Sequence, residues 1–312
     1  MIWLPVGGPY PNWRDCTTIC VNFEMSYIVH GATGAQGFPV LSALQAAGQR
    51  AVAAVRDTTT VADGFASAAV NLADADSLAA SYTGADGVFV HLPLGAPTDL
   101  EIYAKAVAAA VATARPRRVV ISTSGQVVDQ PGTPLQAAPE TPVVQLIRGI
   151  EASGVPTAVV APRLYLENLL LPVVMGPVRA EGVLRYPLPE NFAVSWSSHL
   201  DVADIVTRLL TDPTVTTGTV AVGHRPGLTG ADLAAGFSAY LGTDVRYEAI
   251  TPAAFGDLIT PLFGAGASAG VVGLYELLNA QAGNTVAEEN SAQRLLGLAP
   301  RSVTDWLTQV RA

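Results

Sequence analysis

Short apolar runs alternate with longer stretches of helical periodicity along most of the chain, beginning near residue 27. Apolar runs that are bounded by glycine, proline and polar residues are typical of parallel strands buried on both faces of a sheet. We expect helices between these strands. The pattern predicts strands at residues 27–30, 51–55, 69–72, 87–92, 118–122 and 157–160, and helices notably at 38–47, 100–114 and 143–152. This order of elements predicts an α/β fold, a Rossmann doubly wound parallel sheet.

The rhythm changes after Pro162, where a leucine-rich segment at 164–171 is followed by proline-punctuated chain. Glycine and alanine dominate residues 264–273, which read as a mobile loop or a loosely packed helix. Further elements are expected at 192–196 (strand), 203–210 (helix), 218–222 (strand) and 230–241 (helix). We predict an N-terminal extension at 1–24, a nucleotide-binding Rossmann domain at 25–160, and a smaller α/β substrate lobe at 161–312 from which some segments return to the sheet.

Composition excludes several classes of protein. Half of the residues are hydrophobic, yet no apolar run approaches the roughly 18 residues that a membrane-spanning helix needs. A net charge of -9, with Lys105 as the single lysine, argues against nucleic acid and anionic membranes as partners. The two cysteines, Cys16 and Cys20, provide neither a disulfide framework nor a zinc site, so we expect no metal. We predict a cytoplasmic protein. The sequence leaves open whether the chain forms a homodimer.

The strongest single motif is the segment GATGAQG at residues 31–37, which lies between the first expected strand and the first expected helix. Gly31 permits a tight turn, Gly34 lets a diphosphate approach the backbone, and Gly37 allows the helix to lie close to the strand. The helix N-terminus offers free N–H groups to phosphate. We expect this turn to bind a dinucleotide through the three glycines and Thr33, Ala35 and Gln36. A glycine turn without a ligand is the alternative.

Arg56 and Asp57 follow the second expected strand, where folds that prefer NAD usually place a carboxylate against the ribose hydroxyls. An arginine at this position fits the 2′-phosphate of NADP, because guanidinium makes bidentate contacts to phosphate and stacks on adenine. We therefore predict NADP as the cofactor. The alternative is that the cofactor is NAD. In that case Asp57 would hold the ribose, and Arg56 would be a solvated residue at the end of the strand.

Several segments together resemble the NmrA-like branch of the atypical short-chain dehydrogenase/reductases. They are the turn at 31–37, Arg56, the sequence NLAD at 71–74, APRLYLEN at 161–168 (similar to RPGFFMEN), HLDVAD at 199–204 (similar to HVDDVA), residues 229–242, and the Leu-Gly-x-x-Pro motif at 296–300. The resemblance implies that Asn71 and Leu72 edge the adenine. It places His91, Leu92 and Pro93 along the ribose and diphosphate. It further implies that Ser122, Thr123 and Ser124 face the nicotinamide, with Pro162, Arg163, Leu164 and Tyr165 closing its far side.

The chain departs from that family in its proton-donating machinery. Short-chain dehydrogenases usually carry a Tyr-x-x-x-Lys pair, whose lysine lowers the pKa of the tyrosine, and this sequence has no such pair. Residues 143–152, where some NmrA-like reductases place a lysine, offer only Gln145 and Arg148. We therefore expect Tyr165 to contribute a phenolic hydroxyl, with Ser124 or His91 as an accessory donor. The alternatives are a packing role for Tyr165 and a histidine without a chemical task at His91.

Three functions remain. Hydride transfer to a quinone or polycyclic aromatic ketone needs mainly positioning, since the product oxyanion is stabilised and can take its proton from water. We predict such an NADPH-dependent reductase of small aromatic, polyketide-like substrates, with the apolar residues 169–174 binding the flat ring. The alternatives are a monooxygenase-type tailoring enzyme of aromatic polyketide antibiotic biosynthesis and a non-catalytic NmrA-like redox-sensing regulator.

Overall fold

The structure is a computed structural model that describes residues 26–212, 214 and 218–311. The extension predicted at residues 1–24, with Cys16 and Cys20, lies outside the described residues.

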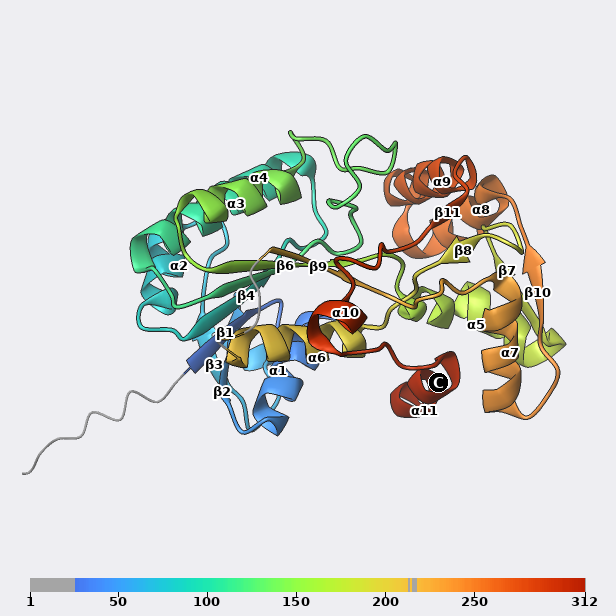
Figure 1. Cartoon of the computed structure of the whole chain (residues 1–312), viewed down its shortest axis with the longest axis horizontal. Helices are drawn as coiled ribbons and strands as arrows, with labels where there is room; N and C mark the ends of the chain where they lie inside the picture. Colours follow the sequence, from blue (N-terminus) through green and yellow to red (C-terminus); the bar gives the residue numbers. More distant parts are fainter. Residues whose placement is uncertain (1–25, 213, 215–217, 312) are drawn as a thin grey trace, which may run out of the picture.

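A parallel sheet organises the molecule (Figure 1). All its strand pairs are parallel, and the strand order reverses between β1 and β4. The strands are, in spatial order, β3 (Ala66–Ala69), β2 (Arg50–Val55), β1 (Ser26–His30), β4 (Gly87–His91), β5 (Val119–Ser122), β6 (Thr157–Pro162) and β9 (Gly218–Val222). Ligands of open α/β sheets bind beyond the carboxyl ends of the strands at such a reversal. The predicted doubly wound Rossmann fold is confirmed.

Helices cover both faces of this sheet (Figure 1). One face carries α2 (Ala75–Tyr82), α3 (Pro97–Ala114) and α4 (Pro142–Ala152), and the other carries α1 (Gly37–Ala46) and α6 (His199–Thr211). The alternation of a strand decides which side chain meets which layer. In β4, Phe89 packs in the cluster with α1 and α6, whereas Val88 and Val90 pack in the cluster with α2, α3 and α4.

The C-terminal half builds a second core beside the sheet (Figure 1). Trp196, Tyr186, Phe237 and Trp306 are buried in it. Two short parallel ladders, β10 with β7 and β11 with β8, join its segments. Its elements are η2 (Leu166–Leu170), α5 (Pro172–Glu181), β7 (Val183–Tyr186), β8 (Ala193–Val194), α7 (Gly230–Leu241), β10 (Arg246–Ala249), α8 (Pro252–Phe263), α9 (Ala265–Asn279), β11 (Gly283–Asn284) and α11 (Val303–Val310), and α10 (Ala292–Leu296) packs near β9.

Two predicted strands are displaced in the structure. The third strand lies at Ala66–Ala69 rather than at 69–72, because residues 71–74 form a turn in which Asn71 Oδ1 accepts a hydrogen bond from the N–H of Ala73. This edge strand consists of small, mostly exposed residues, so it carries no hydrophobic signal. The strand predicted at 192–196 is shorter in the structure, where only β8 (Ala193–Val194) is a strand. The glycine-rich segment at 264–273 adopts the helical alternative, as part of α9.

Over residues 26–212, 214 and 218–311, no helix combines the length and the apolar character needed to cross a membrane.

Candidate active site at the carboxyl edge of the sheet

The glycine-rich turn leaves its main chain open to solvent. Gly31 adopts a positive φ of 60°, and its carbonyl oxygen accepts a 2.8 Å hydrogen bond from the N–H of Gly34. A Cβ at Gly37 would collide with the carbonyl group of Gly31, so α1 begins closer to β1 than any larger residue would allow. Residues 31 and 33–35 are exposed. Free N–H groups at the start of a helix form an anion site, and here an anion can reach them.

The side chain of Gln36 connects this turn to the ends of two other strands. Its Oε1 accepts hydrogen bonds from the hydroxyls of Ser122 and Tyr165, both at 3.0 Å. Its Nε2 donates to Oγ of Ser124 at 3.1 Å. Ser124 has a positive φ of 54°, a strained conformation for a residue other than glycine. Thus a single amide fixes three hydroxyl groups, from the end of β5 and the segments that follow β5 and β6, beside the turn.

Two buried polar atoms at the carboxyl ends of β4 and β5 have no partner among the described residues. The imidazole of His91 lies against Gly31, where a Cβ would strike it. Nε2 of His91 and Oγ1 of Thr123 are buried without a hydrogen-bond partner among the described residues. Native proteins rarely leave such atoms unpaired unless a ligand or water completes them. Together with the open main chain of the turn, they fit a nicotinamide dinucleotide, whose hydroxyl groups would pair with these two atoms.

The ring of Tyr165 packs against a histidine that we did not select from the sequence. The centroids of Tyr165 and His199 lie 4.3 Å apart. The N–H of His199 and the indole N–H of Trp306 both donate to Oε1 of Glu167, at 3.0 and 3.1 Å. Burial raises the pKa of Tyr165 and of Glu167, and lowers the pKa of His199 to about 4. Tyr165 therefore keeps its proton and His199 stays neutral near pH 7. His199 belongs to the HLDVAD segment at 199–204, and the resemblance of that segment to the family was the sequence signal that could have identified it.

The residues expected at the adenine end lie at the ends of β2 and β3, along the same edge of the sheet. Arg56 is exposed directly after β2. Oδ1 of Asp57 accepts hydrogen bonds from both the N–H and the hydroxyl of Thr59, at 2.9 and 2.7 Å, and caps the short helix η1 (Thr58–Thr60). Since one carboxylate oxygen of Asp57 is engaged in this way, Arg56 is the freer of the two side chains. Asn71 is exposed and Leu72 is half-buried.

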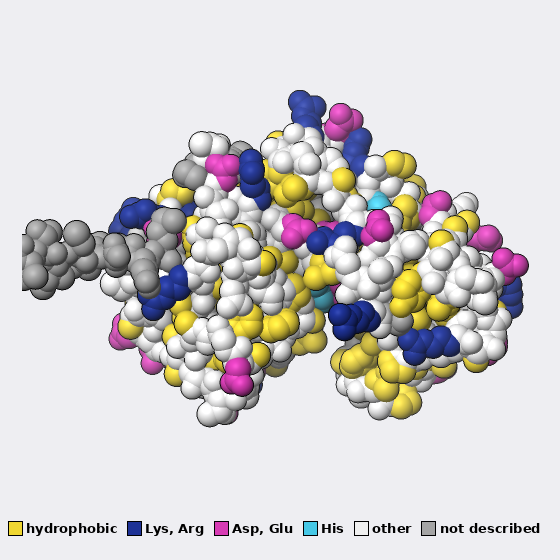
Figure 2. All heavy atoms as spheres, turned by 90° about the horizontal axis from the view of Figure 1, so that it is seen from below, with side chains coloured by type: hydrophobic (Ala, Val, Ile, Leu, Met, Phe, Trp, Pro, Cys, Tyr) yellow, Lys and Arg dark blue, Asp and Glu magenta, His cyan; other side chains and the backbone are white. Residues whose placement is uncertain are grey.

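A cavity of about 390 Å³ adjoins the Gln36 cluster. The segment that follows β5, the segment that follows β6, and α9 contribute to it; its lining includes Ser124, Val127, Arg163, Tyr165, Leu277 and Asn284. Because Ser124 and Tyr165 belong both to this cavity and to the Gln36 cluster, a molecule in the cavity would lie next to the turn. Figure 2 shows the molecule from below, with a notch between its two halves and a histidine side chain at the inner end.

The segment at 169–174 does not line this cavity, contrary to our expectation for a ring-binding surface. Leu169 and Val174 are fully buried and stabilise the C-terminal core instead. Lys105 lies on an exposed turn of α3, 3.9 Å from the carboxylate of Glu101. In the part of the chain that the structure describes, no group of three or more His, Cys, Asp or Glu side chains could hold a metal ion.

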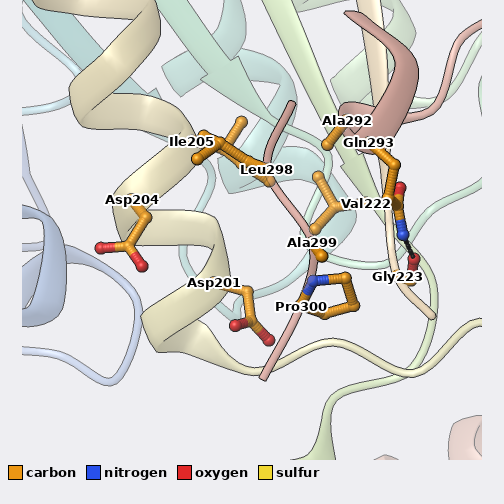
Figure 3. A pocket seen from close by; sticks show the side chains of 10 residues that line it. All are labelled: Asp201, Asp204, Ile205, Val222, Gly223, Ala292, Gln293, Leu298, Ala299 and Pro300. Carbon is orange, nitrogen blue, oxygen red and sulfur yellow. Dashed lines mark hydrogen bonds between the residues drawn. The ribbon is translucent and has the colours of Figure 1, made fainter. Parts of the chain in front are cut away.

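A second, much smaller pocket lies where α6, β9 and the segment before α11 meet (Figure 3). Asp201 and Asp204 stand on one side of it, and Val222 and Gln293 on the other. Asp201 also completes the capping box of α6 with the N-cap residue Ser198, and it pairs with Arg301 at 2.9 Å. The pocket has room for about one water molecule, about 20 Å³, so it cannot hold an aromatic ring.

Comparison with known proteins places the chain in context. A model of the NmrA-like family matches residues 26–307. An NAD(P)H azoreductase of Xenophilus azovorans is 33% identical over an alignment of 235 residues, and the match covers 72% of this chain and 77% of that protein.

Solved structures show the same fold at low sequence identity. A triphenylmethane reductase of Citrobacter sp. in complex with NADP(H) has a TM-score of 0.73 and 16% identity, covering 90% of this chain and 99% of that one. An NADPH-dependent quinone oxidoreductase of Escherichia coli in complex with NADPH has a TM-score of 0.70 and 16% identity, covering 92% and 100%. A nucleoside-diphosphate-sugar epimerase of Staphylococcus aureus has a TM-score of 0.74 and 17% identity, covering 91% and 99%.

Proposed function

Since this chain belongs to the NmrA-like family, we propose that it is an NADPH-dependent reductase of flat, conjugated aromatic acceptors such as quinones and azo compounds. The azoreductase of Xenophilus azovorans supports both the cofactor class and the aromatic acceptor. The exposed Arg56 after β2 favours NADPH over NADH, because guanidinium suits a 2′-phosphate.

One observation carries this proposal: two of the three residues that Gln36 holds, Ser124 and Tyr165, also line the cavity of about 390 Å³. A nucleotide on the turn and an aromatic ring in the cavity would therefore be neighbours. The volume and the mixed apolar and polar lining suit a small planar molecule. Placing two reactants side by side is itself a large part of catalysis for a step that needs no covalent intermediate.

The bound nucleotide would supply the hydride. The main-chain N–H groups of the turn other than that of Gly34, which donates to Gly31, would hold its diphosphate. Nε2 of His91 would accept a hydrogen bond from a ribose hydroxyl, and Oγ1 of Thr123 would pair with a hydroxyl or amide group. Gln36 would keep Ser122, Ser124 and Tyr165 in fixed positions around the reacting ring. These roles are binding and orientation, and they do not require a Tyr-x-x-x-Lys pair, which this chain lacks.

The proton that accompanies the hydride needs no strong acid. Burial raises the pKa of Tyr165, so its hydroxyl keeps its proton. This single O–H, which donates to Oε1 of Gln36 in the structure, would turn to donate to the reduced acceptor. Burial lowers the pKa of His199 to about 4, so this ring would be neutral during turnover. A hydroquinone anion is stabilised by conjugation and can take its proton from water. A simple ketone yields a more basic alkoxide, so we expect ketones to be poor substrates.

The experiment is to mix the full chain with NADPH and a panel that pairs menadione and an azo dye with an unconjugated ketone of similar size, and to follow the near-ultraviolet absorbance of the nucleotide. We expect oxidation with the conjugated members and little with the ketone. Absence of oxidation across the panel would overturn the proposal. Oxygen uptake with a polyphenol and no nucleotide would instead favour a monooxygenase, and nucleotide binding without turnover a regulator.

A further inference from the structure

We propose that Arg163 and the side-chain amide of Asn284 select the acceptor, by pairing with a carbonyl and a hydroxyl of one uncharged aromatic molecule in the cavity. This inference rests on the proposed function only in treating the cavity as the acceptor site. The substrate class is then narrower than conjugated aromatics: neutral ring systems that carry a hydrogen-bond acceptor at one edge and a donor elsewhere.

Arg163 is fully buried, yet its charge is already compensated. Its Nη2 lies 2.9 Å from both carboxylate oxygens of Asp129, and Oδ2 of Asp129 also accepts a 2.9 Å hydrogen bond from Nδ2 of Asn290. Nη1 of Arg163 reaches the carbonyl oxygen of Ala161 at 3.4 Å. Its Nε is buried and has no partner among the described residues. A neutralised guanidinium whose Nε–H is unpaired is a donor for a carbonyl rather than a site for an anion.

Asn284, on β11, is the second residue of the lining that carries an unpaired polar atom. Its backbone is fixed, since β11 pairs with β8 and the carbonyl oxygen of Asn284 accepts a 3.0 Å hydrogen bond from the N–H of Ser195. Its side chain is 3% exposed, and Oδ1 has no partner in the part of the chain that the structure describes. Burying an unpaired amide oxygen costs free energy that a ligand hydroxyl would recover.

The rest of the lining explains why the occupant is uncharged. Among the described residues that line the cavity, Arg163 is the only charged one, and Asp129 neutralises it. A carboxylate or sulfonate would enter without a free counter-charge, at the cost of its hydration. Leu135, Leu164, Leu274 and Leu277 provide an apolar surface for the ring. Two residues of this lining, Arg163 and Asn284, each carry an unpaired polar atom, and a ligand that paired with both would be fixed in an orientation that apolar contacts alone would leave free to rotate.

The test measures binding rather than turnover. The ligands form a series of three steps: tetralin, its ketone tetralone, and the tetralones that carry a hydroxyl at each aromatic position in turn. Tetralone adds a hydrogen-bond acceptor to tetralin, and the hydroxytetralones add a hydrogen-bond donor to tetralone. Each is titrated by calorimetry into the full chain saturated with NADP⁺, where no hydride is available. We expect tetralone to bind tighter than tetralin, and at least one hydroxytetralone to bind about tenfold tighter than tetralone.

Two variants show which residue is responsible for each gain in affinity. Asn284→Leu should abolish the advantage of the hydroxytetralone while keeping the affinity for tetralone. Arg163→Lys keeps a cation beside Asp129 but removes the Nε–H, so it should reduce the advantage of tetralone over tetralin. Asn279→Leu is the matched control, because Asn279 also carries a buried, unpartnered Oδ1 but does not line the cavity. Urea unfolding of each variant checks that it is folded.

Failure of this inference differs from failure of the proposed function. If no hydroxytetralone binds tighter than tetralone to the wild-type chain, or if Asn284→Leu and Asn279→Leu change the series equally, the inference is overturned. Neither result depends on NADPH oxidation, which tests the proposed function by itself.

Discussion

The phenolic hydroxyl of Tyr165 donates a 3.0 Å hydrogen bond to Oε1 of Gln36, although 129 residues separate them in the chain. This contact joins the glycine-rich turn to the cavity, because Gln36 belongs to the turn and Tyr165 lines the cavity. In the sequence, Gln36 is one residue of a phosphate-binding motif. In the structure it also orients hydroxyl groups beside the cavity.

Replacing Gln36 by leucine should uncouple these two parts. The change leaves the hydroxyls of Ser122, Ser124 and Tyr165 without their amide partner, and we expect acceptor reduction to slow by about tenfold to a hundredfold through lost positioning. Ser124→Ala, which removes only one of the three hydrogen bonds, should have a smaller effect. Steady-state NADPH oxidation with menadione measures both. Equal rates for Gln36→Leu and the wild type would contradict the positioning role.

Arg56→Ala should change the preference between nucleotides. We expect the affinity for NADPH to fall by roughly 30-fold, about 2 kcal/mol, and the affinity for NADH to change little, since only NADPH carries the 2′-phosphate. Arg117→Ala is the control, because Arg117 precedes β5 at the opposite edge of the sheet and pairs with Asp86. Calorimetry gives the four dissociation constants, and equal losses for NADPH and NADH would discredit the assignment.

Gly37→Ala should disrupt the turn itself. A methyl group there meets the carbonyl of Gly31, so we expect the free energy of unfolding to fall by about 1–3 kcal/mol and nucleotide binding to weaken. Gly176→Ala, in the middle of α5, meets nothing within 4 Å and should raise the stability by about 0.5–1 kcal/mol. Urea unfolding compares them, and a neutral Gly37→Ala would contradict the close approach of α1 to β1.

Protonation of His30 should destabilise the fold in acid. His30 is fully buried, and its Nε2 lies 2.7 Å from the hydroxyl of Tyr82; burial, and next the nearby His91, lower the pKa of His30 from 6.5 to about 3. The unfolded chain therefore binds one proton more than the native protein between these values. Stability is complete above pH 6.5 and falls as the pH drops, by about 1.4 kcal/mol per pH unit for this group.

The His30→Gln variant isolates this contribution. Glutamine keeps a hydrogen-bonding partner for Tyr82 but does not titrate, so its free energy of unfolding should decline less steeply than that of the wild type. Urea unfolding between about pH 7 and pH 5 should separate the two slopes by about 1.4 kcal/mol per pH unit below pH 6.5. Parallel slopes would mean that His30 accepts a proton in the native state.

The sequence predicted the parts of the fold that local pattern determines. In β4 the buried run Val88–Phe89–Val90 leaves no polar face, and Gly31 and Gly37 mark a turn that larger residues cannot form. The edge strand β3 was misplaced because its stability comes from backbone pairing with β2 rather than from apolar side chains. For the glycine-rich start of α9 the sequence left two readings open, since glycine weakens a helix without excluding it.

Contacts between residues that are far apart in the chain could not be predicted from the sequence. Nothing local links Arg163 to Asp129, 34 residues earlier, or brings Asn284 to the same cavity. The tilted contact between the rings of His199 and Tyr165 also depends on tertiary packing. The roles assigned to the nucleotide-binding residues, and the division at residue 160, stay predictions.

Single-turnover oxidation of protein-bound NADPH by menadione tests the central claim most directly, with deuterium placed on each face of the nicotinamide C4 in turn. We expect oxidation to depend on menadione in a saturable manner, far faster than in free solution, and to slow with only one of the two labels, because the site presents one face of the ring to the cavity. Oxidation no faster than in solution, or equally affected by both labels, would contradict hydride transfer at this site.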